Sequence, residues 1–299
     1  MTRKELRGVI PALITPMRKD GSIDYDAMEA NVAFLSRSGV HGFFVNGTTS
    51  EGPILSRAEK HETVRIVKSV SEGRQTICAA CIAPSANLAI EEIRDIAALE
   101  PDYVVCVAPF YYQVPQEAIV DHFTRICAST DIPVIFYDIP QHTRNPIEVP
   151  TRFALINAGL GVAMKDSSGD FSGFSRSLLG CERKDFVWIQ GDDMLDSYSM
   201  AIGARGIVSG LANVAPKPFI ELVECAERGD LTGLFRIQEK INALAEILPA
   251  VGGRVIPAIK AAVSYLGRCE PWLRHTALTA SESETAALVK IVDGLHSLI

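Results

Sequence analysis

The sequence contains no cluster of basic residues and no long hydrophobic segment. It carries 36 acidic against 29 basic residues, a formal net charge of -7, and no run of lysine or arginine that would suit nucleic acid or an anionic membrane. No apolar stretch approaches the ~20 residues that a transmembrane helix needs. Residues 1–7 carry charges without a following apolar segment, so no secretory signal is expected. These absences argue against a nucleic-acid-binding or membrane protein and predict a cytoplasmic one.

Patterns for metal ligation and disulfide bonding are also absent. The seven cysteines are an odd number in a long chain, which is typical of a reduced compartment rather than of a disulfide framework. The one close pair, Cys78 and Cys81, lies in an expected strand, where residues three apart point to opposite faces and cannot share a metal. The six histidines are scattered, with no pair at helical metal-ligand spacing. The sequence therefore predicts no metal site.

What the chain does contain is a repeated pattern of a short apolar segment followed by an amphipathic stretch. Nearly continuous apolar segments are typical of parallel strands covered on both faces. A capping box formed by Ser56 and Glu59 predicts a helix that runs to about Ser71. Helical periodicity covers residues 86–99, 116–129 and 216–228. The expected strands are residues 8–14, 42–46, 76–82, 103–107, 133–137, 161–165, 186–190 and 206–209.

Eight strand-then-helix units predict an α/β fold, a (β/α)8 TIM barrel, over residues 1–229. The rival, a doubly wound open sheet, usually has fewer strands, and no Gly-x-Gly-x-x-Gly follows the first strand here. Residues 230–299 are expected to form a C-terminal helical extension. Its three predicted helices are residues 231–248, residues 254–266, and a last one that opens with Thr279 and Glu282 and ends near Leu295.

Barrel enzymes carry their chemistry at the carboxyl ends of the strands, and Lys165 ends the sixth expected strand. Alternation places it with Gly161 and Ala163 on one face and the larger Val162 and Met164 on the other. The larger pair should face the helices, so Lys165 should point into the barrel mouth. Desolvation there favours the neutral amine, which can attack a carbonyl and form a Schiff base. The alternative is a lysine that ends a strand and pairs with the aspartate that follows it.

Three more strand ends carry candidate site residues. Tyr137 ends the neighbouring strand on the same inner face, where a phenol beside an imine-forming lysine can move protons; the alternative is a rim tyrosine with its hydroxyl in water. Gly47, Thr48 and Thr49 form a turn whose N–H groups and hydroxyls suit a carboxylate, or a plain turn with capping threonines. Ser209 ends the eighth strand and is a candidate substrate contact.

Two other pairs have ordinary explanations. Tyr111 and Tyr112, in the loop after the fourth strand, are typical of an aromatic loop cluster or a subunit contact. Asp192 and Asp193, after the seventh strand, are typical of a solvated helix N-cap. A metal site would need further converging carboxylates.

Together these residues resemble the dihydrodipicolinate synthase / N-acetylneuraminate lyase family of class I aldolases and lyases, from residue 8 to about residue 267. The resemblance implies a Schiff base between Lys165 and pyruvate, or the pyruvyl part of a 2-oxo acid. It also implies no metal or organic cofactor and a homotetramer, described as a dimer of dimers. The motifs that carry it are Thr15-Pro-x-x-x-Asp-Gly-x-Ile-Asp24, Asn46-Gly-Thr-Thr-Ser-Glu51, Ala108-Pro-Phe-Tyr-Tyr112, Phe136-Tyr-Asp-Ile-Pro140 and Met164-Lys-Asp-Ser-Ser-Gly-Asp170.

The resemblance also implies roles for single residues. Tyr137 would be the acid/base residue, and Thr48 and Thr49 would hold the carboxylate of the 2-oxo acid. Thr48 would link Tyr137 into a proton relay, which Tyr111 would complete from a neighbouring subunit.

Some positions depart from the family pattern. Ser50 stands where a glycine is usual, and Asp138 replaces a common asparagine. Dihydrodipicolinate synthases carry an arginine after Tyr-x-x-Pro that helps bind aspartate semialdehyde; here His142 takes that position and Arg144 falls two residues later. The substrate signals are mixed. The stretch 191–193 resembles the synthases, the Phe-Tyr-Tyr order resembles neuraminate lyases, and residues 46–56 and 231–248 resemble 2-keto-3-deoxygluconate aldolases.

The expected function is that of a Schiff-base pyruvate lyase or aldolase that reversibly cleaves a 2-keto-3-deoxy sugar acid to pyruvate and an aldehyde. The first alternative is dihydrodipicolinate synthase, which condenses pyruvate with aspartate semialdehyde. An N-acetylneuraminate lyase-like enzyme and a keto-deoxy-acid dehydratase are further alternatives. A non-catalytic ligand-binding paralogue is the alternative from another class, but it would have no need for both Lys165 and Tyr137.

Overall fold

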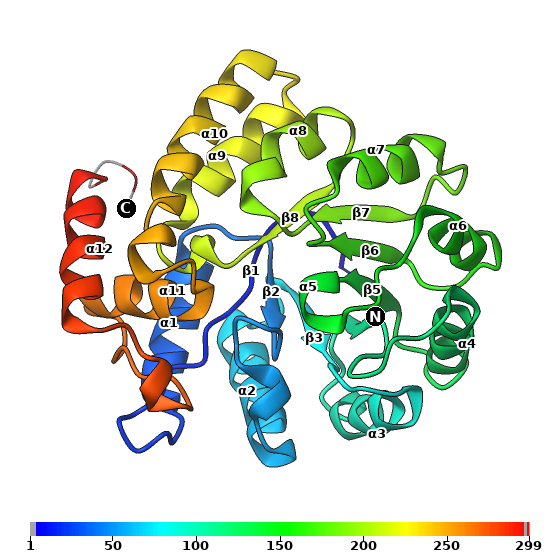
Figure 1. The fold of residues 1–299 in the computed structure, drawn as a ribbon, viewed down its shortest axis with the longest axis horizontal. Coiled ribbons are helices and arrows are strands. Elements are labelled where there is room, and N and C mark those ends of the chain that lie inside the picture. Colours follow the sequence, from blue (N-terminus) through cyan, green and yellow to red (C-terminus); the bar gives the residue numbers. More distant parts are fainter. Residues whose placement is uncertain (1–3, 296–297, 299) are drawn as a thin grey trace.

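The computed structural model describes residues 4–295 and 298. Eight strands lie at the centre, and helices surround them (Figure 1). Each strand overlaps the segment predicted for it. The strands are β1 (Gly8–Pro11), β2 (Gly42–Val45), β3 (Thr76–Ala80), β4 (Tyr103–Val107), β5 (Val134–Asp138), β6 (Ala163–Asp166), β7 (Val187–Gln190) and β8 (Gly206–Ser209).

All neighbouring strands pair in parallel, in the order β1-β8-β7-β6-β5-β4-β3-β2. The two end strands also meet: His41 N donates to Val9 O at 2.9 Å, and Leu13 N donates to Phe44 O at 3.0 Å. The sheet therefore curls into a barrel, and the (β/α)8 prediction is confirmed.

Helices cover the outer surface of this barrel. The predicted capping box at the start of α2 is present, because the Ser56 side chain accepts from Glu59 N while the Glu59 carboxylate accepts from Ser56 N. The barrel helices are α1 (Tyr25–Arg37), α2 (Arg57–Ser71), α3 (Ala86–Ala97), α4 (Gln116–Cys127), α5 (Pro140–Thr143), α6 (Val149–Asn157), α7 (Phe171–Gly180), α8 (Asp196–Ala201) and α9 (Pro216–Glu227), with 3-10 turns η1 (Gly52–Ile54), η2 (Asp193–Leu195) and η3 (Leu211–Asn213).

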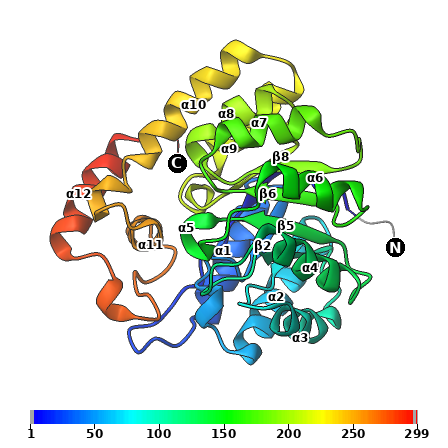
Figure 2. The ribbon, with the colours of Figure 1, turned by 45° about the vertical axis from the view of Figure 1, so that its right-hand side comes forward.

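The C-terminal residues form the three predicted further helices, which lie along one side of the barrel (Figures 1 and 2, yellow to red). They are α10 (Leu231–Ala245), α11 (Val255–Tyr265) and α12 (Glu282–Gly294), with η4 (Pro249–Val251) and η5 (Thr276–Leu278) between them. The division of the chain into domains at residue 229 stays a prediction. Residues 1–3, part of the segment 1–7 in which no secretory signal is expected, lie outside the described residues.

The predicted start of the last helix is wrong by a few residues. Ser281 is the N-cap of α12 and forms the capping box with Glu284. Thr279 instead belongs to the preceding turn, because its N–H donates to Thr276 O and its hydroxyl accepts from Leu273 N.

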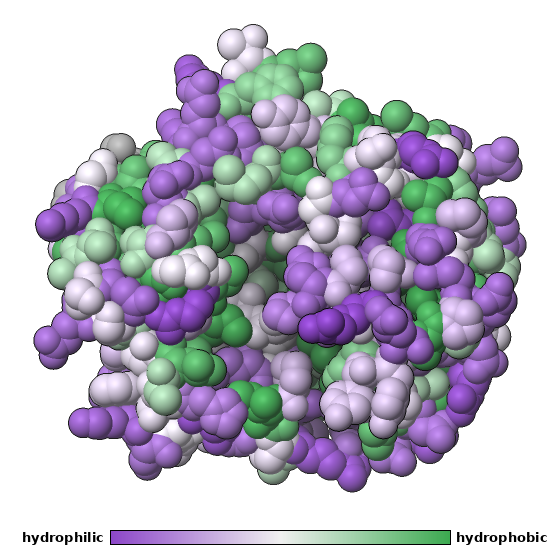
Figure 3. All heavy atoms as spheres, in the orientation of Figure 1, coloured by the Kyte–Doolittle hydropathy of each residue, from purple (hydrophilic) through white to green (hydrophobic). Residues whose placement is uncertain are grey.

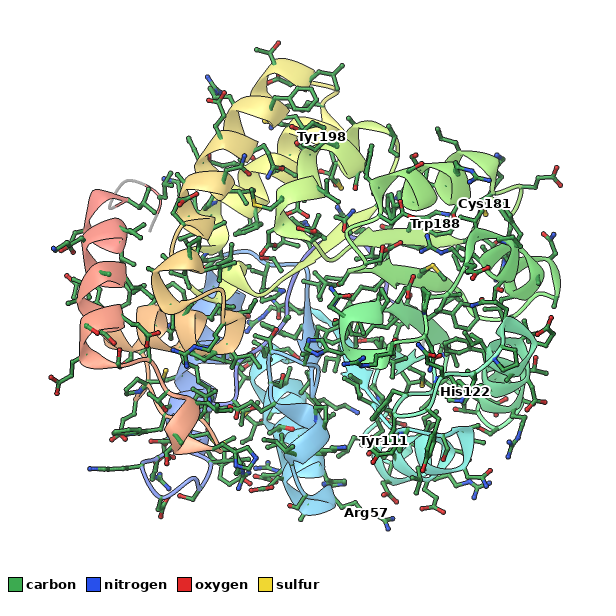
Figure 4. All side chains as sticks on the ribbon, in the orientation of Figure 1. Arg57, Tyr111, His122, Cys181, Trp188 and Tyr198 are labelled. Carbon is green, nitrogen blue, oxygen red and sulfur yellow. The ribbon has the colours of Figure 1, made fainter. Side chains whose placement is uncertain are left out.

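Two hydrophobic clusters flank the strands, one inside the barrel and one between the strands and the helices. Cys78 belongs to the inner cluster and Cys81 to the outer one, so the two thiols lie on opposite sides of the sheet as predicted. Burial raises the pKa of both thiols far above the ordinary range. Met164 and Trp188 belong to the outer cluster, and Figure 4 shows Trp188 beside α7.

One predicted side-chain direction is wrong. Val162 packs against the inner cluster rather than toward the helices. The strand begins only at Ala163, and Gly161 before it has a left-handed backbone with a φ of 58°. Strict alternation therefore does not reach back to Val162.

Among the described residues, no single helix is long and apolar enough to cross a membrane. One pair of helical segments, Leu231–Val251 and Val255–Tyr265, passes on length and composition together, but the two are bent by 109°.

Candidate active site

A cavity of about 600 Å³ lies at the carboxyl ends of the strands. Figure 3 shows this face with a hollow near its centre. Four of the predicted site residues line the cavity: Thr48, Thr49, Tyr137 and Lys165. The barrel therefore brings together side chains from β5, β6 and the turn after β2.

Tyr137 and Lys165 are direct partners in the parallel ladder between β5 and β6. Only 2% of Tyr137 and 4% of Lys165 is exposed. The Lys165 Nζ lies 3.9 Å from the centroid of the Tyr137 ring and 4.4 Å from that of Phe44. An amine and a phenol thus lie side by side in a buried site lined by aromatic rings at the barrel mouth. The strand pattern predicts this arrangement.

Gly191, directly after β7, gives the lysine its space. A Cβ at this position would lie 2.8 Å from Lys165 Cε and 2.2 Å from Ser167 Oγ. Any other residue would push the lysine side chain away. The stretch 191–193, which resembles the synthases, begins with this glycine. Its contact with Lys165 depends on the pairing of β6 with β7 and is not visible in the sequence.

Buried polar contacts fix the turn that carries Thr48 and Thr49. The Ser50 hydroxyl donates to Leu13 O at 2.6 Å and thereby ties the turn to the end of β1. The left-handed backbone at this point belongs to Glu51, with a φ of 58°, and not to Ser50. A serine at the usual glycine position therefore fits without strain.

Glu51 connects the same turn to the C-terminal helices. Its Oε1 accepts from Lys260 Nζ on α11 at 2.6 Å, and its Oε2 accepts from Arg274 N at 2.9 Å. Both charged side chains are buried, at 5% and 0% exposed. Burial lowers the pKa of Lys260, and Glu51 opposes that shift. Sequence reasoning missed this pair because its members are 209 residues apart.

Two predicted binding residues lie beneath the cavity wall instead of in it. Gly47 is buried, and a Cβ there would lie 2.2 Å from the Phe44 ring. Ser209 is 1% exposed, and its Oγ accepts from Ala212 N at 3.1 Å where η3 begins. Their direct contacts with substrate stay predictions.

Tyr111 points away from this chain's cavity. It is 82% exposed, has a φ of 80°, and meets Tyr112 edge to face at 4.9 Å. Figure 4 shows it near α3, away from the centre of the barrel. No hydrogen bond among the described residues joins Thr48 to Tyr137, so the relay that would end at a neighbour's tyrosine stays a prediction.

Asp192 and Asp193 both line the cavity but differ in surroundings. Asp192 Oδ1 accepts from Met194 N at 3.1 Å and caps η2, as predicted. The prediction of a solvated side chain is wrong for Asp193, because its Oδ1 is buried and the carboxyl turns toward Ser209. Burial raises the pKa of Asp193 to about 7, against the opposing effect of the Ser209 hydroxyl.

The C-terminal helices supply the outer wall of the cavity, which the sequence analysis did not foresee. Their contribution is apolar except for one cation, Arg254, at the N-cap of α11. The short helix α5 adds Gln141 and His142 to the opposite side. From the C-terminal residues the wall takes Ala245, Leu248, Gly253, Arg254, Val255, Ile256, Pro257, Leu273 and Leu278.

This arrangement can carry out imine chemistry. A buried primary amine can form a Schiff base with a carbonyl compound, and the neighbouring phenol can supply and remove protons. In the part of the chain that the structure describes, no group of three or more His, Cys, Asp or Glu side chains is placed to hold a metal ion.

Comparison with known proteins identifies the family. The model of the Dihydrodipicolinate synthetase family matches residues 5–295. This chain belongs to that family. The family comprises class I enzymes that form a Schiff base with pyruvate and act on an aldehyde, so the predicted enzyme class is confirmed.

Similar proteins carry the name of one activity. A 4-hydroxy-tetrahydrodipicolinate synthase of Methanothrix thermoacetophila is 32% identical and covers 98% of both chains. One of Bifidobacterium longum is 34% identical over 87% of this chain and 84% of its own. The crystal structure of dihydrodipicolinate synthase from Aquifex aeolicus has a TM-score of 0.91 at 28% identity, covering 98% and 99% of the two chains. The Acinetobacter baumannii enzyme, solved with pyruvate, has a TM-score of 0.92 at 26% identity, covering 99% and 100%.

These comparisons favour the synthase, the first alternative, over the keto-deoxy sugar acid aldolase that the sequence analysis placed first. Most residues of the two segments that suggested an aldolase are bonded within the fold, and each segment places only two residues in the cavity wall: Thr48 and Thr49, and Ala245 and Leu248. Residues 46–56 are bonded to the end of β1 and to α11, and α10 is a packing helix whose buried face joins the outer hydrophobic cluster. The resemblance of these segments therefore reflects the packing of the barrel more than the lining of the cavity.

Replacing Lys260 by methionine is expected to destabilise the fold and to loosen the turn that carries Thr48 and Thr49, the threonine turn. The variant leaves Glu51 buried without its cation, which costs on the order of 3 kcal/mol. Urea unfolding of Lys260→Met, Glu51→Gln and the double variant measures this. The double variant should lose less than the sum of the singles; strict additivity would contradict a direct pair.

Proposed function

We propose that this protein is a 4-hydroxy-tetrahydrodipicolinate synthase that condenses pyruvate with aspartate semialdehyde. The observation that carries the proposal is the buried pairing of Lys165 with Tyr137 at the barrel mouth. The names of the similar proteins support this choice of reaction.

The pyruvate half of the reaction uses Lys165 as the electron sink. The lysine nitrogen bonds to the carbonyl carbon of pyruvate. The carbonyl oxygen leaves as water with one proton from the nitrogen and one from the Tyr137 hydroxyl, and an iminium results. Tyr137, as the phenolate, takes a proton from the methyl carbon, and that electron pair moves toward nitrogen to give an enamine. Thr48 and Thr49 hold the carboxylate, so that the imine keeps one orientation throughout.

In the second half, the enamine carbon attacks the aldehyde carbon. The new carbon–carbon bond leaves an alkoxide, which takes a proton from Tyr137. The amino group of aspartate semialdehyde then attacks the iminium carbon and closes the ring. One of its protons passes to the nitrogen of Lys165, which leaves as the amine, and the other returns to Tyr137. Over the whole reaction a single molecule of water leaves, and the enzyme returns to its starting state.

The carboxylate of aspartate semialdehyde needs a donor, and Arg254 is the group we assign to it. Its Nη1 donates to Leu278 O at 2.7 Å, its Nη2 to Glu284 Oε1 at 2.7 Å, and its Nε to Val251 O at 3.2 Å. The other N–H of each terminal nitrogen is available to a ligand. A guanidinium is permanently charged and binds carboxylates in a bidentate way, whereas His142, at the position expected for arginine, offers fewer donors.

The proposal includes the predicted homotetramer and the predicted cytoplasmic location. The high exposure of Tyr111 in this chain is consistent with its predicted place in the relay of a neighbouring subunit.

The purified protein is expected to consume pyruvate and aspartate semialdehyde together and to form the cyclic product. Proton NMR of the mixture checks this, with Lys165→Ala as the folded, inactive control. Consumption of neither substrate, by an enzyme that still exchanges the methyl protons of pyruvate with D2O, would contradict the synthase and leave only the Schiff-base chemistry.

Replacing Arg254 by leucine is expected to raise the KM for aspartate semialdehyde about tenfold or more, since a hydrogen bond to a charged group is worth about 1.5–3 kcal/mol. The KM for pyruvate should stay within about twofold, because Arg254 has no hydrogen bond to Lys165 or to the turn that carries Thr48 and Thr49. Glu284→Ala is the matched control: it removes the acceptor of the same tie between α11 and α12 but keeps the guanidinium. Equal KM values for the two variants would sink this assignment.

A further inference from the structure

Behind Tyr137 and Lys165, one arginine joins the two strands that carry them. Arg152, on α6, donates from Nη2 to Asp138 Oδ2 at 2.8 Å, and its Nη1 lies 2.9 Å from Asp166 Oδ2. Asp138 and Asp166 directly follow the tyrosine and the lysine, and they are themselves paired in the β5–β6 ladder. Because side chains alternate along a strand, the aspartates point out of the barrel where the tyrosine and lysine point in.

The three charged side chains are almost fully buried. Arg152 is 3% exposed, Asp138 1% and Asp166 3%. Two carboxylates face a single cation, so the cluster has an excess negative charge that burial makes costly. Burial first, and then Asp166, raise the pKa of Asp138 to about 7, against the opposing effect of Arg152. Because burying these charges costs free energy of folding, we expect the cluster to have a role other than stability.

The same contacts reach other parts of the cavity wall. Arg152 Nε donates to Ile147 O at 2.7 Å, and Asp138 Oδ1 accepts from Ile147 N at 3.2 Å, which anchors the segment after α5. Asp166 Oδ1 accepts from Ser168 N at 2.8 Å. One guanidinium therefore fixes the ends of β5 and β6 and the loops that leave them.

We propose that Arg152, held between Asp138 and Asp166, is a positioning residue that keeps Tyr137 and Lys165 in register for proton transfer at the pyruvate imine. The inference rests on the proposed Schiff-base chemistry and does not depend on which aldehyde is used. The planar fork of arginine can hold two carboxylates at fixed angles, which a lysine ammonium cannot do. Charge alone is therefore insufficient for this task.

The test uses a half-reaction that needs no aldehyde: exchange of the methyl protons of pyruvate with D2O, followed by NMR. Arg152→Lys is expected to slow exchange at saturating pyruvate at least about tenfold per folded enzyme, because small misplacements of reacting groups are costly. The KM for pyruvate should change less than about threefold, since the threonine turn binds its carboxylate.

Asp166→Asn is the second variant, in case the lysine variant does not fold. It removes the surplus charge and so keeps or raises the melting temperature, but the amide has one oxygen where the carboxylate offers one to Ser168 N and the other to Arg152. Its exchange is expected to be slowed about threefold or more. A variant that is as stable as the parent yet slower is not explained by a purely structural role.

Lys60→Met is the matched control for lost stability. Lys60 pairs with Glu92 at 2.6 Å between α2 and α3, away from the β5–β6 edge of the cavity. The Lys60→Met variant should have a lower melting temperature and an unchanged exchange rate. If Arg152→Lys and Asp166→Asn both fold and exchange at the parent rate, the positioning role is wrong. If the parent protein itself does not exchange, the Schiff-base function fails instead.

Discussion

The parallel pairing of β5 with β6 sets Tyr137 opposite Lys165, and the rest of the site depends on this register. A slip of either strand by one residue would turn its side chain out of the barrel, because strand side chains alternate. The amine lies against the phenol ring and the Phe44 ring, and Gly191 leaves the space that its side chain needs. The proposed imine chemistry therefore depends on the backbone pairing of these two strands.

Buried ionic contacts hold that register and the turn beside it from outside the barrel. Arg152 on α6 forms ion pairs with Asp138 and Asp166 at the ends of the two strands. Lys260 on α11 forms an ion pair with Glu51 in the threonine turn. Such pairs bring little net stability when the cost of desolvation is counted. We infer that these ion pairs instead hold the strand ends and the threonine turn in place. They also make the C-terminal helices part of the site, since α11 both anchors the turn and starts with Arg254 in the cavity wall.

Local patterns predicted much of this molecule. Alternation placed Lys165 and Tyr137 at the barrel mouth, and the capping box at Ser56 set the start of α2, because both rules involve only near neighbours. The contacts of Lys260 and Arg152 were out of reach, since they join segments that only the folded barrel brings together. The predicted direction of the Val162 side chain was wrong because Gly161, which has a left-handed backbone, interrupts the alternation. The comparisons favour an aldehyde other than the one expected first, because most residues of the two segments that suggested it are bonded within the fold and few of them line the cavity.

Trapping with borohydride in the presence of pyruvate tests the central claim most directly. Reduction fixes an imine as a stable secondary amine, which intact-mass analysis and peptide mapping can locate. The account predicts one pyruvyl adduct per chain, on Lys165. A folded protein that shows no adduct at saturating pyruvate, or an adduct on another lysine, would contradict it.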